Sequence, residues 1–166
     1  MKKANPTSPD NQTDLEKFWV LLRNNGYEDP EFAEVMVAAE DLISAYDMAS
    51  LEKAAKAYPK TLFCWDAHSL KESIDGLKKR LARSADSDNR GFLCLVLDRA
   101  DNTVTEVEIV ARSLRVAYTD AIQSRKENIG QRNRAGDCGF SVAMAFDIAD
   151  LEALLLRLDP TTKLAQ

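Results

Sequence analysis

The sequence contains few of the residues that mark disulfide scaffolds, metal sites or membrane spans. Three cysteines and one histidine among 166 residues are too few for a disulfide framework or for a zinc site with three or four ligands. No apolar run approaches the roughly 18–20 residues of a membrane-spanning helix, and no glycine-rich phosphate loop ending in Gly-Lys-Ser or Gly-Lys-Thr occurs. These absences argue against disulfide scaffolds, zinc ribbons and integral membrane proteins, and they predict a reducing compartment and no bound metal.

The composition is acidic overall but includes one basic segment. The chain is 45% hydrophobic and 30% charged, with a net charge of −5, and this balance disfavours a nucleic-acid partner. Residues 112–136 nevertheless contain six basic and two acidic residues, a net charge of +4. This segment is either a solvated helix face followed by a loop or a site for phosphate or a nucleotide-like cofactor. The candidate cofactor-binding residues are Arg125, Lys126, Arg132 and Arg134.

The order of polar and apolar stretches predicts one α+β domain behind a disordered tail. Residues 1–13 are polar and offer almost nothing to bury, so we expect them to be disordered, without a secretory signal peptide. The domain covers residues 14–166. Its first part, 14–60, is predicted to be helical, with helices starting at the Thr13–Glu16 capping box, after Asp29-Pro30, and at Ser50.

The second part of the domain, 61–166, is predicted to hold a short mixed or antiparallel sheet. The expected elements are a strand over 61–65, a helix over 69–83, and a hairpin of strands over 91–97 and 104–110. Residues 110–122 fit either a helix or a strand. The apolar spacing from Cys138 to Leu158 predicts a long helix, with a break at Asp147 or Asp150 as the alternative. No internal repeat is evident from the sequence.

The three thiols lie in different local surroundings. Cys64 and Cys94 are inside apolar runs, where cysteine behaves as a small hydrophobic residue. Cys138 follows the basic loop and opens the predicted long helix, whose N-terminal dipole would lower the thiol pKa and favour the thiolate. The sequence leaves open whether Cys138 is such a functional thiol or a buried structural cysteine. His68, the single histidine, is expected at a helix start rather than in a metal site with Cys64.

The segment Gln131-Arg132-Asn133-Arg134-Ala135-Gly136-Asp137-Cys138-Gly139-Phe140-Ser141 resembles the nucleophile segment of one cysteine-protease-like clan. This clan includes the ubiquitin-like-protein proteases and the YopJ family of bacterial effector acetyltransferases. The order of the predicted elements is similar over roughly residues 47–151.

The resemblance implies a sheet with a central helix opened by Cys138 and a set of roles for particular residues. Cys138 would be the nucleophile, and Glu108, or Glu106 in a shifted alignment, would be the acid that orients the base. Gln131 or Gln123 would donate to the oxyanion, and acetyl-coenzyme A would be the cofactor.

The chain departs from the family at the catalytic base. The family histidine belongs at the start of the first hairpin strand, where this chain has Gly91-Phe92-Leu93-Cys94. Without that imidazole, attack by Cys138 lacks its general base. We therefore predict a YopJ-like, catalytically degenerate effector that acts by binding a protein partner, located in the bacterial cytoplasm or exported by type III secretion into a host cell. The alternatives are an active acyltransferase that acetylates Ser, Thr or Lys of a host protein through Cys138, and an unrelated cytosolic α+β binding domain.

Overall fold

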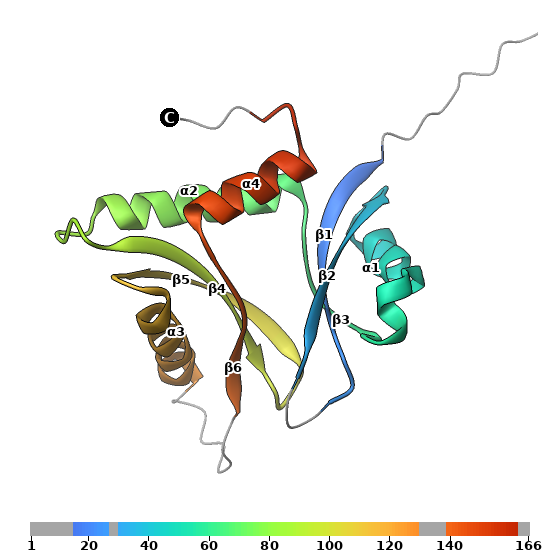
Figure 1. Ribbon diagram of the computed structural model, residues 1–166, viewed down its shortest axis with the longest axis horizontal. Helices are drawn as coiled ribbons and strands as arrows, with labels where there is room; N and C mark the ends of the chain where they lie inside the picture. Colours follow the sequence, from blue (N-terminus) through green and yellow to red (C-terminus); the bar gives the residue numbers. More distant parts are fainter. Residues whose placement is uncertain (1–14, 27–29, 130–138, 163–166) are drawn as a thin grey trace, which may run out of the picture.

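The computed structural model describes residues 15–26, 30–129 and 139–162. The elements in chain order are β1 (Glu16–Arg23), β2 (Phe32–Ala39), α1 (Leu42–Leu51), the short 3-10 helix η1 (Lys53–Lys56), β3 (Lys60–Trp65), α2 (Ala67–Ala82), β4 (Arg90–Asp98), β5 (Thr103–Ala111), α3 (Leu114–Ile129), β6 (Phe140–Asp147) and α4 (Ile148–Leu158). This mixture of helices and antiparallel sheets confirms the predicted α+β class. Figure 1 shows two sheets that come close together at the bottom of the view and open toward α2 and α4 at the top, while α1 and α3 lie on the outer sides.

The two sheets are built in the same way, which shows that the described chain is a tandem of two ββαβα units. The strand orders are β2-β1-β3 and β5-β4-β6, and in each sheet the central strand is antiparallel to both neighbours. The ladders even share an irregularity: the register shifts between Leu21 and Leu22 in the first sheet and between Leu95 and Val96 in the second. The sequence analysis missed this internal repeat.

Superposing the two topologies reveals matched residues that are too sparse to notice in the sequence alone. In the strand–helix segment, identical residues at equivalent places are Glu34 and Glu106, Val35 and Val107, Ala39 and Ala111, Leu42 and Leu114, Ala45 and Ala117, Tyr46 and Tyr118, and Ala49 and Ala121. We use "counterpart" for residues related in this way. The buried alanines are among them because small side chains let each outer helix approach its sheet closely.

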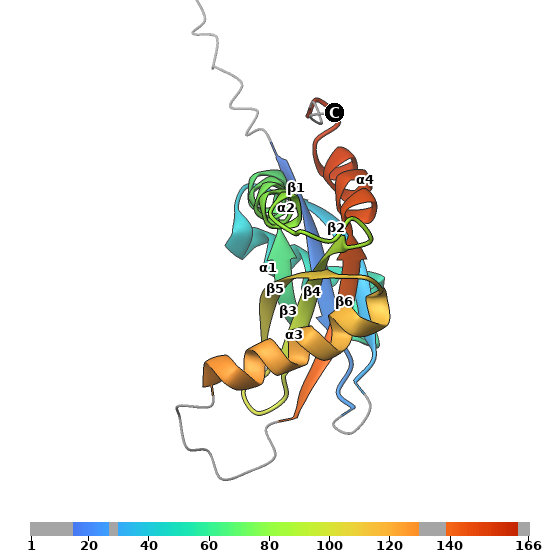
Figure 2. The ribbon, with the colours of Figure 1, turned by 90° about the vertical axis from the view of Figure 1, so that its left-hand side faces the viewer.

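Three hydrophobic cores follow from this repeated arrangement. The central core lies between the inner faces of the sheets and helices α2 and α4, and it contains Trp19, Trp65 and Leu70 of the first unit with Leu93 and Leu151 of the second. Each outer core lies between one sheet and its outer helix, α1 or α3. The side view in Figure 2 shows α2 and α4 next to each other, and α3 crossing the second sheet.

The prediction of helices between residues 14 and 39 was wrong, since this stretch forms β1 and β2. Six of the eight residues of β1 are buried because α1 covers one face of the sheet and the central core covers the other. A strand covered on both faces needs an unbroken apolar run rather than alternation. The run from Phe18 to Leu22 is of that kind, and short apolar runs do not distinguish a buried strand from a helix.

The helix predicted to be opened by Cys138 was also wrong in the part that the structure describes. Residues Phe140–Asp147 form β6, and α4 begins only after Asp147. A capping box starts α4, in which the Asp147 carboxylate accepts from the Asp150 backbone N–H at 3.0 Å. The alternative, a helix broken at Asp147, gave the right position for the boundary, but the residues before it form a strand and not a helix. Cys138 itself lies outside the described residues.

The remaining predictions follow the structure more closely. Strand β3, helix α2 and the β4–β5 hairpin confirm the strand over 61–65, the helix over 69–83 and the hairpin. The ambiguous stretch after residue 110 finishes β5 and then forms α3. The helix predicted from Ser50 is instead the end of α1 followed by η1.

Candidate functional site

The two glutamates predicted as catalytic acids line a shallow pocket at the free edge of β5. Glu106 and Glu108 alternate along the strand and therefore project from the same face. The pocket has a volume of about 360 Å³ and is completed by Arg80 of α2 and by Ser124, Arg125 and Asn128 of α3. The structure thus brings the candidate acids together with one of the candidate cofactor-binding residues, Arg125.

Both carboxylates already have partners within the fold. Glu106 accepts hydrogen bonds from the indole Nε1–H of Trp65 and from Ser73 Oγ, the latter at 2.9 Å. Glu108 lies 3.4 Å from Arg80 Nε, and Arg80 Nη1 donates to the Glu108 backbone oxygen at 2.9 Å. Each glutamate therefore has a structural function that needs no substrate.

The counterpart of Glu106 shows that its role is repeated in the first unit. Glu34 accepts from the indole Nε1–H of Trp19 at 2.6 Å, as Glu106 does from Trp65. Both tryptophans are almost fully buried, and a buried indole N–H requires an acceptor. Both tryptophans belong to the first unit, so Glu34 satisfies Trp19 within that unit while Glu106 reaches Trp65 from the second unit.

The other predicted site residues are not brought into this pocket by the described structure. Cys138, Gln131, Arg132 and Arg134 lie outside the described residues. Gln123 is exposed on α3 and donates to Glu127 Oε1 at 2.9 Å. Lys126 is also exposed on α3 and does not line the pocket.

The described residue next to Cys138 belongs to the end of the sheet away from Glu108. The backbone oxygen of Gly139 accepts from Arg99 N at 3.1 Å, beside the β4–β5 turn. Glu108 is instead level with Leu93, near the opposite end of β4.

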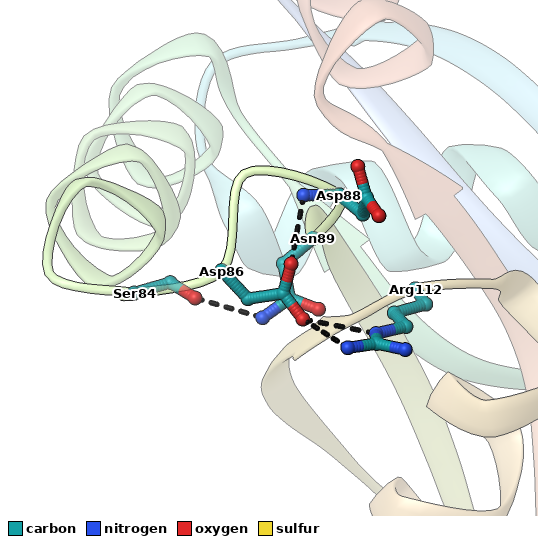
Figure 3. A network of polar contacts seen from close by, with 5 residues as sticks. All are labelled: Ser84, Asp86, Asp88, Asn89 and Arg112. Carbon is teal, nitrogen blue, oxygen red and sulfur yellow. Dashed lines mark hydrogen bonds and ion pairs between the residues drawn. The ribbon is translucent and has the colours of Figure 1, made fainter.

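One arginine of the basic segment is occupied by an ion pair that fixes a loop. Arg112 donates through both Nε and Nη2 to Asp86 Oδ2, at 2.9 and 2.6 Å. The pKa of Asp86 is lowered by the hydrogen bond from the backbone N–H of Asp88 and by Arg112. Figure 3 shows this network, in which Asn89 also donates to Ser84. Arg112 therefore ties the loop before β4 to the start of α3.

The two described thiols are structural. Cys94 is fully buried in the outer core of the second unit, at the place that Val20 occupies in the first, and burial raises its pKa to about 11. Burial, with a smaller contribution from the Asp66 charge, raises the pKa of Cys64 to about 12. Cys94 is buried in its outer core and Cys64 packs against the other one, so both occupy places suited to small hydrophobic residues, as the sequence predicts.

His68 occupies the helix start predicted for it. Asp66 caps α2 by accepting from the backbone N–H of Ser69 at 2.6 Å. The exposed His68 side chain lies 3.4 Å from Glu72 Oε1, one turn further along the helix. In the part of the chain that the structure describes, no cluster of three or more histidine, cysteine, aspartate or glutamate side chains is arranged to hold a metal ion.

The outer face of α1 is the feature that the sequence analysis missed. Ile43 and Leu51 are 76% and 79% exposed, and Leu42 and Met48 are also exposed. We call Ile43, Asp47, Met48 and Leu51 the α1 face; Leu42 is instead on the side of the helix that carries the buried Ala45 and Ala49. The sequence of α1, Leu-Ile-Ser-Ala-Tyr-Asp-Met-Ala-Ser-Leu, has apolar residues on more than one side of the helix, although Ser44, Asp47 and Ser50 stand between them. This distribution was the available signal, because apolar residues around a helix are normally covered.

No family model matches the chain, and no curated protein matches it either. Across the described ranges, no helix is both long enough and apolar enough to cross a membrane.

Proposed function

We propose that this protein acts by binding a protein partner through the α1 face. The observation that carries the proposal is the difference between α1 and its counterpart helix α3. At the places of Ile43, Asp47 and Leu51, the second unit has Arg115, Thr119 and Gln123. The second unit forms the same sheet and the same outer core with polar residues there, so the fold itself does not require an apolar α1 face.

The exposure of these side chains is costly for a free protein. Burying a leucine or isoleucine contributes about 1.5–3 kcal/mol relative to leaving it in water. Single exposed apolar residues are ordinary, whereas a contiguous apolar patch with a polar rim is typical of an interaction surface. Ile43 and Leu51 lie two turns apart on one side of the helix and flank Asp47, while Met48 is three residues from Leu51, so these exposed apolar side chains surround a single exposed carboxylate.

This proposal retains the predicted partner-binding role and leaves the thiol outside it. Acyl transfer through Cys138 needs a general base. Among the described residues, the single histidine stands exposed at the start of α2, paired with Glu72. Glu106 and Glu108 are bonded to Trp65 and Arg80. These contacts support a binding role over acetyl transfer. The kinship with the YopJ family, and export as an effector, remain predictions from the sequence.

Two measurements test the proposal. A photo-crosslinking amino acid placed at position 43 should capture a protein partner in the native host cell, whereas the same amino acid at the counterpart position 115 should not. Equal capture at the two positions would contradict a role for the α1 face. Incubation with radiolabelled acetyl-coenzyme A should leave the protein and added substrates unlabelled. Labelling that disappears in Cys138→Ala would replace binding by catalysis as the primary activity.

A further inference from the structure

We infer that the partner presents an amphipathic helix with two apolar side chains about two turns apart and a lysine or arginine between them. This inference rests on the proposed function, because it specifies the chemistry of the segment that the α1 face binds.

The shape of the α1 face sets the spacing of the partner residues. Ile43, Asp47 and Leu51 follow one another at intervals of four, so they form a single stripe along the helix. With a rise of 1.5 Å per residue, Ile43 and Leu51 are separated by about 12 Å along the axis. A helix packed along this stripe would place its own apolar residues against Ile43 and Leu51, and its central residue against Asp47.

The charge around the stripe selects a basic partner. Residues 40–56, which comprise α1 and the residues on either side of it, contain four acidic and two basic residues, a net charge of −2. The acidic residues Glu40, Asp41, Asp47 and Glu52 are all exposed, and the basic ones, Lys53 and Lys56, belong to η1 beyond the end of α1. Asp41 caps α1 by accepting from the backbone N–H of Ser44 at 2.7 Å, and this hydrogen bond lowers its pKa. These exposed carboxylates attract a cationic segment through complementary potential.

The same charge disfavours a second copy of this chain as the occupant. Two α1 faces packed against each other would bring Asp47 of one copy close to Asp47 of the other, with repulsion between like charges. The helix α3 is not a better candidate, because its corresponding stripe consists of Arg115, Thr119 and Gln123, and its exposed apolar residues Leu114, Val116 and Tyr118 are not on that stripe.

A pair of designed peptides tests the inference. Both peptides are helical, with leucines seven residues apart; one has lysines between and beside the leucines, and its twin has glutamates at those places. Each is labelled with a fluorophore and titrated with the full-length protein in fluorescence anisotropy. We expect the lysine peptide to bind at least about tenfold more tightly than its twin, a difference that shrinks as salt increases.

Substitutions that copy α3 onto α1 provide matched variants, because the second unit already tolerates those residues. Ile43→Arg with Leu51→Gln should remove binding of the lysine peptide. Asp47→Thr should reduce the preference for lysine over glutamate to about a third or less of its wild-type value, while the apolar contacts retain weak binding. Arg115→Ala on α3 should change neither affinity, and circular dichroism should show that every variant is folded.

The outcomes separate the inference from the proposal beneath it. If the glutamate peptide binds as tightly as the lysine peptide, and the Ile43→Arg, Leu51→Gln variant loses both, the α1 face binds but the basic partner is wrong. If wild type binds neither peptide, or the variant binds both as wild type does, the α1 face is not a docking surface and both ideas fail. A concentration-dependent dimer that Ile43→Arg abolishes would identify a second copy as the occupant and overturn the inference.

Discussion

Replacing Glu106 by alanine should destabilise the fold more than replacing Glu108, although both were candidates for the same catalytic position. Glu106 accepts from the indole of Trp65, whose side chain is 1% exposed. Leaving a buried donor without an acceptor costs about 1–3 kcal/mol. The hydroxyl of Ser73, which also donates to Glu106, adds little, because it is within 3.1 Å of the Ser69 backbone oxygen as well. We expect a loss of about 2 kcal/mol in unfolding free energy.

Glu108 provides the matched comparison. It pairs with Arg80 across side chains that are 60% and 30% exposed, and such partly solvated ion pairs contribute roughly 0–1 kcal/mol. Urea unfolding followed by the fluorescence of Trp19 and Trp65 measures both variants. The free energy of unfolding of a chain of this size falls by about 2 kcal/mol for each molar of urea, so Glu106→Ala should lower the midpoint of the unfolding transition by about 1 M urea.

A double-mutant cycle identifies the responsible contact. In a Trp65→Phe background the indole N–H is gone, so Glu106→Ala should cost less than about 0.5 kcal/mol further. An equal cost of Glu106→Ala in both backgrounds, or a cost no larger than that of Glu108→Ala, would refute the argument that Glu106 serves Trp65. The proposed role of the repeated glutamate would then have to be abandoned.

Three further predictions concern other parts of the molecule. Asp147→Ala removes the cap of α4 and the ion pair with Arg90, so thermal unfolding should show a loss of about 1–2 kcal/mol that Asp147→Asn partly restores; no loss would mean that the cap is dispensable. Gly91→Ala should destabilise by about 1–3 kcal/mol in urea, because the added Cβ would lie 3.0 Å from side-chain atoms of α2 and α4; wild-type stability would show that these helices yield freely. In iodoacetamide labelling of the native protein at pH 8, Cys64 and Cys94 should react far more slowly than after unfolding, because burial raises both pKa values and the thiolate is the reactive form; rapid native labelling would contradict their placement.

Local signals in the sequence accounted for the elements that were predicted well. Helix α2 has its buried residues, Leu70, Ile74 and Leu77, on one side only, so its apolar residues recur at the spacing typical of a helix. The strands of the β4–β5 hairpin are connected by a polar turn in which Asn102 adopts a left-handed conformation with φ of 59°. Asparagine tolerates this conformation better than most residues do. In these places the residue pattern alone was sufficient.

The failures have a common cause in burial on two faces. Both β1 and β6 lie between an outer core and the central core, and neither has the alternation of a half-exposed strand. The candidate site was affected in the same way. Glu106 looked available for catalysis in the sequence, yet its carboxylate is held by Trp65, which is 41 residues away along the chain.

By itself, the sequence determined the fold class, the hairpin, helix α2 and the inert character of Cys64 and Cys94, because each depends on neighbouring residues. Only the tertiary structure decided that the chain is a repeated ββαβα unit, since that equivalence lies in strand order and in scattered matched positions rather than in continuous identity. It also decided which residues of α1 are exposed, because the sequence alone does not show which side of this helix the sheet covers. Ile43 and Leu51 face outward because Ala45 and Ala49 already occupy the side of α1 that meets the sheet.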